Sequence, residues 1–212
     1  SDLWAEVEAA EMNGRSAPHM MGASVIGLNV GFGKVMLFDR DDYNRVDGVS
    51  VMSGTFGDDH ALAKALQRIG KRTVFAASNI RQAMGARGFR ALWDRQLRWM
   101  VIRRDEAPLV FFAEAFFGCL STTLLGVAGF VSLGMPVLPV AVATPLFWLA
   151  SEALVVAAKG WGSKWFWRYS LAAICRECLL VAWWLRTWFS CKVTCGGTAL
   201  GSAPRKLTRT GR

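Results

Sequence analysis

Two long apolar stretches limit how the second half of this chain can fold. Residues 109–134 contain a single charged residue, Glu114, and residues 135–158 contain only Glu152. Each stretch exceeds the roughly 18 to 20 apolar residues with which a helix crosses the bilayer core, where a helix satisfies its own backbone hydrogen bonds. Between them, Gly134–Met135–Pro136 favours a turn. We therefore predict two membrane-spanning helices that form a hairpin.

A third apolar stretch, residues 165–189, carries charges near its centre. Arg176 and Glu177 lie there, and a charge at mid-bilayer costs roughly 3 kcal/mol on insertion scales. Tryptophan settles at the headgroup level, and this stretch contains Trp165, Trp167, Trp183, Trp184 and Trp188. We expect an interfacial or re-entrant helix. A third span is the alternative, because Arg176 and Glu177 could pair inside a helix bundle.

The basic residues predict the orientation of the chain in a membrane. Lys and Arg outnumber Asp and Glu by 25 to 16, but 53% of the residues are hydrophobic, which favours a membrane over nucleic acid as the partner. Six arginines between residues 87 and 104 precede the first span, and a basic tail over 191–212 ends the chain. Basic segments flank spans on the cytoplasmic side. We therefore expect an integral membrane protein whose polar half and basic tail are cytoplasmic.

The polar half, residues 1–106, holds most of the acidic residues and has mixed patterns. It predicts helices over 4–12 and 61–68 and a long basic, aromatic helical region over 82–104. The Gly-rich, β-branched residues 23–37 predict a strand, a turn and a strand, and residues 73–77 a further strand. This mixture favours part of an α/β domain, followed by a membrane region over 107–190.

Two acidic residues stand where a loop turns into a helix. Asp58 and Asp59 follow Gly57, and the helix that they open is expected to end at Gly70. The positive end of the helix dipole stabilises negative charge there, and an ionised carboxylate can accept a proton from a hydroxyl nucleophile. The simpler interpretation is an N-cap, and the residues alone favour it.

A basic and aromatic group follows in the long helical region. Arg95 and Arg98 are three residues apart and share a helical face, with Trp99 beside them. Two guanidinium groups on one face suit a diphosphate, and Trp99 can stack on a sugar or a lipid. The alternative is a juxtamembrane helix that binds anionic headgroups. The Cys175–x–x–Cys178 pair lies in an apolar stretch without a nearby histidine, so we predict buried thiols there and no metal site.

Taken in order, these motifs resemble those of one enzyme family. Gly57–Asp58–Asp59–His60 is followed by Arg95-Gln-Leu-Arg98-Trp99, then by apolar stretches and by Cys195-Gly-Gly-Thr-Ala199. This series resembles the C-terminal portion of the ceramide glucosyltransferases of glycosyltransferase family 21, a branch of the processive-type GT-A enzymes. The Cys-Arg176-Glu177-Cys run resembles an Arg-Glu pair of that family. Bacterial hopanoid-linked glycosyltransferases are a related group that shares the first two motifs.

The resemblance implies roles for individual residues. Asp59 would be the general base that deprotonates a lipid hydroxyl, which attacks UDP-glucose with inversion at the anomeric carbon. Arg95, Arg98 and Trp99 would bind the diphosphate and the acceptor, and Asp58 would be a supporting acid in the substrate site. The implied function is transfer of glucose from UDP-glucose to ceramide, in sphingolipid biosynthesis, at the cytoplasmic face of the membrane.

One departure from the family pattern concerns the metal. The family binds Mg²⁺ or Mn²⁺ through an earlier DxD-type motif, whereas Asp39-Arg-Asp41 lies too close to Asp59 and is expected to be a loop that opens a short helix. The chain also begins with Ser1 and has no signal-peptide pattern. We therefore expect the C-terminal part of a larger enzyme, with a separate nucleotide-binding half. The alternatives are another lipid glycosyltransferase, such as a hopanoid-linked one, and a catalytically inactive membrane scaffold.

Overall fold

The computed structural model divides the chain into two compact units. Unit 1 comprises residues 1–17 and 82–190, and unit 2 comprises residues 18–81 and 191–212. The structure describes residues 2–33, 35–53, 55, 57–76, 82, 85–161 and 166–190, together with the backbone of residues 193–195 and 198–200. Trp165, Ala77 and the tail from residue 201 onward, about which the sequence makes predictions, lie outside the described residues. Each unit is described by itself.

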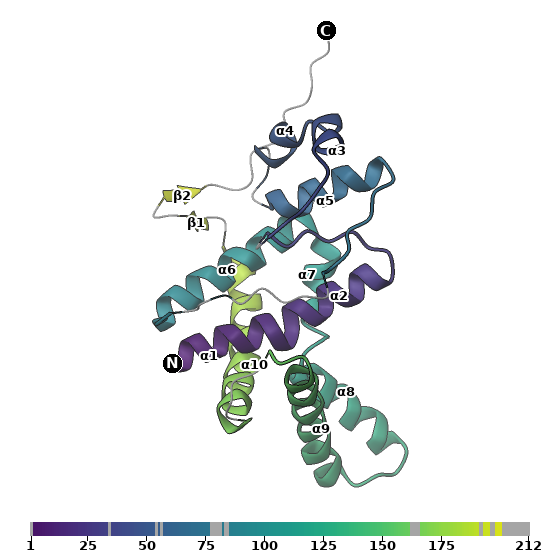
Figure 1. The fold of residues 1–212 in the computed structure, drawn as a ribbon. Helices are drawn as coiled ribbons and strands as arrows, with labels where there is room; N and C mark the ends of the chain where they lie inside the picture. The colour runs from purple at the N-terminus through teal and green to yellow at the C-terminus, as the bar shows by residue number, and fades with distance from the viewer. Residues whose placement is uncertain are drawn as a thin grey trace. The chain divides into compact units, whose positions relative to one another are not determined.

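Helices make up most of the described chain (Figure 1). Unit 1 contains α1 (Leu3–Ala10), the π-helix η1 (Glu11–Ser16), α6 (Phe89–Glu106), α7 (Pro108–Glu114), α8 (Cys119–Ser132), α9 (Val137–Ala158) and α10 (Phe166–Trp188). Unit 2 contains most of α2 (Ala17–Val25), then α3 (Arg40–Arg45), α4 (Gly48–Ser53), α5 (Asp58–Arg68) and the strands β1 (Val193–Cys195) and β2 (Thr198–Leu200). The two strands pair antiparallel, with Val193 opposite Leu200.

The predicted α/β fold, a partial GT-A domain over residues 1–106, is wrong. Residues 17–25 form α2, and no strand occurs in the described part of residues 2–76. Side chains provide the hydrogen bonds that a strand ladder would have provided. The Asn29 amide donates to the carbonyl of Lys71 (2.8 Å) and accepts from the backbone N–H of Thr73 (3.1 Å), and the Ser24 hydroxyl donates to the carbonyl of Thr73 (2.9 Å).

The predicted helices of the polar half are confirmed. The first prediction, residues 4–12, corresponds to α1 and the start of η1, and the long basic region corresponds to α6, which begins at Phe89 rather than at the predicted residue 82. At the end of α5, Gly70 has a φ of 83°, its N–H donates to Gln67, and the N–H of Lys71 donates to Leu66. This pair of bonds is the Schellman motif, which needs a left-handed residue after the helix. Glycine therefore ends α5 where the sequence predicted.

The predicted hairpin is present, but its first arm is broken. The turn at Gly134 repeats the bond pattern of Gly70, and α8 packs against α9 (Figure 1). Residues 109–134, however, form α7 and α8, which meet at an angle of 64°. The break is stabilised from α10, because the carboxylate of Glu177 accepts from the backbone N–H of Cys119 (2.6 Å) at the start of α8. A carboxylate there compensates the unpaired N–H groups and the helix dipole.

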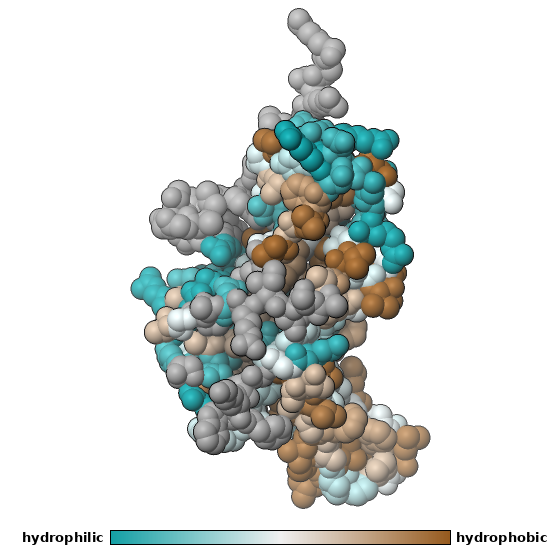
Figure 2. All heavy atoms as spheres, in the orientation of Figure 1, coloured by the Kyte–Doolittle hydropathy of each residue, from teal (hydrophilic) through white to brown (hydrophobic). Residues whose placement is uncertain are grey.

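One helix among the described residues is by itself long and apolar enough to cross a membrane. This helix is α9, and α7 with α8 meets the same criterion only if the bent pair is taken as one span. Figure 2 shows hydrophobic residues gathered over α8 and α9. The 165–189 stretch forms α10, which does not meet the criterion. The cytoplasmic orientation of the two ends stays a prediction.

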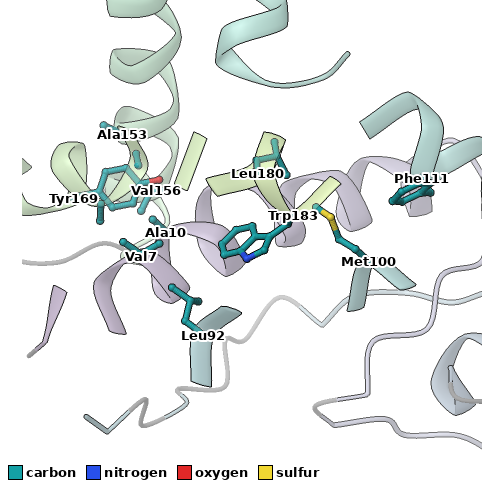
Figure 3. Packing of buried hydrophobic residues seen from close by; sticks show 12 residues of the cluster. Val7, Ala10, Leu92, Met100, Phe111, Ala153, Val156, Tyr169, Leu180 and Trp183 are labelled. Atoms are coloured by element: carbon teal, nitrogen blue, oxygen red, sulfur yellow. The ribbon is translucent and has the colours of Figure 1, made fainter. Parts of the chain in front are cut away.

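The core of unit 1 lies where α1, α6, α7, α9 and α10 meet. Val7 and Ala10 of α1, Leu92 and Met100 of α6, and Trp183 of α10 are almost completely buried (Figure 3). Aromatic rings link the helices, with the ring centroids of Trp93 and Trp183 6.1 Å apart. The short N-terminal helix is thus an integral part of the helical unit that contains α9.

Candidate functional site

Asp58 and Asp59 lie in the first turn of α5, in unit 2. The N-cap is Gly57 rather than either aspartate. The carboxylate of Asp58 accepts from the N–H of Asp59 (3.0 Å), and that of Asp59 accepts from the N–H of His60 (2.8 Å). Asp58 is exposed, whereas Asp59 is half-buried. The two acids therefore differ in surroundings although they are adjacent in sequence.

A glycine loop holds the Asp59 carboxylate from the other side. The N–H of Gly33 donates to Oδ2 of Asp59 (2.5 Å). Gly31 lies so close to the backbone of Asp59 that a Cβ at this position would collide with the Asp59 carbonyl group. Each carboxylate oxygen thus accepts one backbone N–H and keeps lone-pair capacity for a further proton. Sequence spacing does not connect this loop with Asp59.

Arg95, Arg98 and Trp99 lie on α6, in unit 1. The Arg95 guanidinium donates to the carboxylate of Glu8 (2.7 Å), and the Arg87 guanidinium lies 3.1 Å from the other oxygen of Glu8. The Glu8 side chain is only 1% exposed. The Arg95 guanidinium carbon also lies 6.0 Å from the centroid of the Trp99 ring. Arg95 is therefore oriented by a buried acid from α1, which sequence spacing does not reveal.

The candidate residues fall into two sets. Asp58 and Asp59 belong to unit 2, whereas Arg95, Arg98 and Trp99 belong to unit 1. The structure brings the two aspartates together in one helical turn, and it places Arg95 and Trp99 side by side on one helix. The joint use of the two sets stays a prediction.

A buried ion cluster centred on Arg176 occupies the interior of unit 1. The Arg176 guanidinium binds the Glu152 carboxylate with two bonds (2.7 and 2.8 Å), and it also donates to Glu177 (2.6 Å) and to the carbonyl of Ala10 (3.1 Å). Tyr169 donates its hydroxyl proton to Glu152. The Arg176 side chain is 1% exposed. Mid-helix charges in α9 and α10 are thus satisfied inside the protein, and Arg176 pairs with Glu177 as the sequence suggested.

A second ion group connects η1 to α6 and α7. Arg15 lies 3.1 Å from Glu11 and 3.8 Å from Glu114, and Arg103 lies 2.8 Å from Glu114. Burial by itself would raise the pKa of the Glu11 carboxyl, but the charges of Arg15, Arg176 and Arg103 outweigh it and lower that pKa below its ordinary value. Residues 107–212 hold only three acids, Glu114, Glu152 and Glu177. All three are ion-paired in unit 1.

The described residues do not fit a divalent metal site. Among the described parts of the chain, no group of three or more His, Cys, Asp or Glu side chains could hold a metal ion. Asp39, the first residue of the DxD-like spacing, is the N-cap of α3, and its Oδ1 accepts from the N–H of Asp41 (2.8 Å) and of Asp42 (3.1 Å). The expected loop that opens a short helix is therefore confirmed, and this carboxylate stabilises the start of that helix.

Comparison with known proteins gives one match. A family model described as "Glycosyl transferase family 21" matches residues 1–203, almost the whole chain. No curated protein matches, and no solved structure matches. The match covers the α5 aspartates, the α6 arginines and the helices with the buried ion cluster.

Proposed function

Because the chain belongs to glycosyltransferase family 21, we propose that it acts in the transfer of glucose from UDP-glucose to ceramide. In this proposal it forms the C-terminal part of an inverting, membrane-bound lipid glycosyltransferase of sphingolipid biosynthesis, with its site on the cytoplasmic face. The observation that supports the proposal most strongly is Asp59, a half-buried carboxylate that backbone N–H groups hold at the first turn of α5.

The proposed step is a single displacement in which Asp59 is the general base. Its carboxylate takes the proton of the acceptor hydroxyl, and the hydroxyl oxygen forms a bond to the anomeric carbon of the sugar. The bond between that carbon and the diphosphate oxygen breaks, and the electron pair leaves with UDP. The N–H groups of Gly33 and His60 orient the carboxylate so that the proton acceptor is already placed.

We assign the leaving diphosphate to the basic face of α6. Arg95 and Arg98 would donate hydrogen bonds to it, and Trp99 would stack on the sugar or the lipid. Glu8 neutralises part of the Arg95 charge and fixes its guanidinium plane, which leaves the remaining N–H groups for phosphate oxygens. Asp58, which is exposed, is assigned a supporting position in the acceptor site.

Two further parts of the proposal concern groups outside the described site. The complete enzyme would use Mg²⁺ or Mn²⁺ to offset charge on the diphosphate. Since the described residues do not fit such an ion, we assign it to a separate nucleotide-binding part and derive no step through it. The rival function is transfer to a hopanoid-type acceptor, and a catalytically inactive membrane scaffold is the second rival.

An Asp59→Asn substitution tests the proposal. In membranes that contain the assembled enzyme, we expect the rate of glucosyl transfer from UDP-glucose to ceramide to fall by about 10²- to 10⁴-fold, the usual contribution of a general base. The matched control is Asp58→Asn, which removes the neighbouring exposed carboxylate and should lower the rate far less. Full activity of Asp59→Asn would refute the base assignment, and product analysis by mass spectrometry separates ceramide from hopanoid acceptors.

A further inference from the structure

An unbroken apolar stripe runs along the exposed side of α10. Its members follow one another at alternating intervals of four and three residues, which places them on one helical face: Trp167, Leu171, Ile174, Cys178, Val181, Leu185 and Trp188. Cys178 is also exposed, so the prediction of a buried thiol there is wrong, and the other six side chains are 40% to 62% exposed. We call these seven residues the α10 stripe.

The opposite face of α10 is fully used inside unit 1. Ala172, Ala173 and Trp183 are completely buried in the core, and Arg176 is bound by Glu152 and Glu177. Helices α1 and α6 cover this face, and α6 exposes charged side chains of its own. On α6, the side chains of Arg90 and Asp94 are 96% and 61% exposed. The layer formed by α10 and its covering helices is therefore apolar on one side and charged on the other.

From this two-sided layer we infer that α10 lies along the membrane surface, with the α10 stripe among the acyl chains of the bilayer. An amphipathic helix of this kind lies in the interface plane, with its apolar face about 5 to 10 Å deep. Tryptophan is the residue that settles at this depth, and it ends the stripe at Trp167 and Trp188. The inference rests on the membrane location in the proposed function but does not require catalysis.

The covering helices distinguish a surface helix from a third span. Arg176 donates to the carbonyl of Ala10 in α1, and the Trp183 ring lies tilted beside the Trp93 ring of α6, so both helices lie over the middle and C-terminal half of α10. If α10 crossed the bilayer, these contacts would carry Arg90 and Asp94 of α6 toward its core. Exposed charges at that depth are costly. A surface position keeps them in water.

Charge distribution also decides between lipid and a second copy of the chain. The residues of the α10 stripe have the same four- and three-residue spacing as the seam of a coiled coil. Charged pairs at the flanks of such a seam usually stabilise it. The exposed positions of the described part of α10 include one charged residue, Arg186, and no acid that could pair with it in a second copy. Arg186 stands near the Trp188 end, where an anionic headgroup would meet it.

Spin labels along the α10 stripe test the inference by depth. The chain is placed in nanodiscs of phosphatidylcholine with an anionic phosphatidylglycerol fraction, with single labels at positions 171, 174, 178, 181 and 185 and its other cysteines replaced by alanine. Labels at position 147 in α9 and position 90 in α6 provide the deep and aqueous references. We expect all five labels to be more accessible to oxygen than to a water-soluble nickel complex, at one constant shallow depth.

Each other pattern would overturn the inference. A depth profile that is deepest at position 178 and shallow at both ends would make α10 a third span. Low accessibility to both reagents, together with spectral broadening, would show that the α10 stripe is an interface between copies of the chain. High accessibility to the nickel complex would show that the stripe lies in water. If the alanine replacements prevent folding, a label on native Cys178, with buried Cys119 retained and Cys175, Cys191 and Cys195 replaced by serine, gives the depth at the centre. The inference requires this depth to equal the constant shallow depth expected for the five labels. The measurement does not depend on sugar transfer, so its failure is distinguishable from failure of the proposed function.

Discussion

Arg176 shows how this chain tolerates a charge within an apolar helix. Its guanidinium has two acidic partners and a carbonyl partner, and almost none of it is exposed. Removing one member of such a buried group leaves the others without compensation. We expect Arg176→Met to lower the free energy of unfolding in detergent by about 3 to 5 kcal/mol, measured by chemical denaturation.

The matched control for this prediction lies on the same helix. Arg186 is exposed and donates to the Ser190 hydroxyl (3.0 Å), so Arg186→Met should change the free energy of unfolding by less than about 1 kcal/mol. The double variant Arg176→Met with Glu152→Met removes the guanidinium and one of its two acids, which leaves less uncompensated charge, so it should be more stable than Arg176→Met alone. Equal destabilisation by Arg176→Met and Arg186→Met would contradict the role of the cluster.

Glu11 gives the pH dependence of stability at the same scale. Its pKa in the folded protein lies below the ordinary value of 4.5, so folding stabilises the ionised form. This contribution is complete above about pH 4.5 and disappears as the pH falls through the folded pKa. We expect Glu11→Gln to lower the free energy of unfolding by about 3 kcal/mol near neutral pH, with a difference that shrinks in acid.

The control for Glu11 is an exposed carboxylate. Asp94 lies 4.0 Å from Arg90, and both side chains are exposed, so Asp94→Asn should have an effect of less than about 1 kcal/mol at neutral pH. If the free energies of unfolding of Glu11→Gln and of the unchanged chain differed by the same amount at neutral and at acidic pH, Glu11 would make no such contribution.

The sequence revealed these residues only in part. Isolated charges in apolar stretches pointed to Arg176 and Glu177, because an unpaired charge there is costly. The partner of Arg95 was not predictable, since Glu8 lies 87 residues earlier in the chain. Asp59 was singled out by its place before a helix, but its bond to Gly33 arises from a loop of residues that carries no periodic pattern. Long-range pairings of this kind depend on the packing of whole helices.

At the scale of elements, the close packing of η1 against α9 and α10 depends on Gly14. A Cβ on Gly14 would collide with the Glu152 carboxylate and the Tyr169 hydroxyl, so only glycine lets η1 approach α9 and α10 this closely. We expect Gly14→Ala to lower the free energy of unfolding by about 1 to 3 kcal/mol, the usual cost of overpacking. Denaturation in detergent measures it.

Gly22 in α2 provides the opposite case. A Cβ there would meet nothing within 4 Å, so Gly22→Ala should be neutral or should stabilise the chain by up to about 1 kcal/mol, the helix propensity difference. If both alanine variants behaved alike, the close approach at Gly14 would not be what stabilises η1.

Some elements were predictable because a local sequence signal specifies them, and others were not because contacts between distant residues specify them. Helix α5 ends at Gly70 and helix α8 turns toward α9 at Gly134, and at both places a local bond pattern requires a left-handed residue. The strands predicted over 23–37 and 73–77 rested on composition alone, which is rich in glycine and β-branched residues over 23–37. Hydrogen bonds from Asn29 and Ser24 hold those segments without a sheet, and propensity does not report on such contacts.

For the whole molecule, α9 carries the strongest membrane prediction. It has 22 residues, about 33 Å of helix at the usual rise, and Phe147 near its centre is 76% exposed. We expect Phe147→Arg to make insertion less favourable by about 3 kcal/mol, measured as the fraction of chain that resists alkaline extraction from membranes. Phe147→Leu is the control and should insert normally. Unchanged extraction of Phe147→Arg would argue against α9 as a span.

The bidentate bond between Glu152 and Arg176 also has a consequence for the order of synthesis. Glu152 leaves the ribosome 24 residues before Arg176, so α9 is complete while its acid still lacks the guanidinium that binds it. Ala10, whose carbonyl also accepts from Arg176, is made much earlier and waits longer still. Correct assembly therefore completes only when α10 has emerged, and a nascent chain that stops between α9 and Arg176 carries an uncompensated acid. We expect cellular quality control to recognise such a chain.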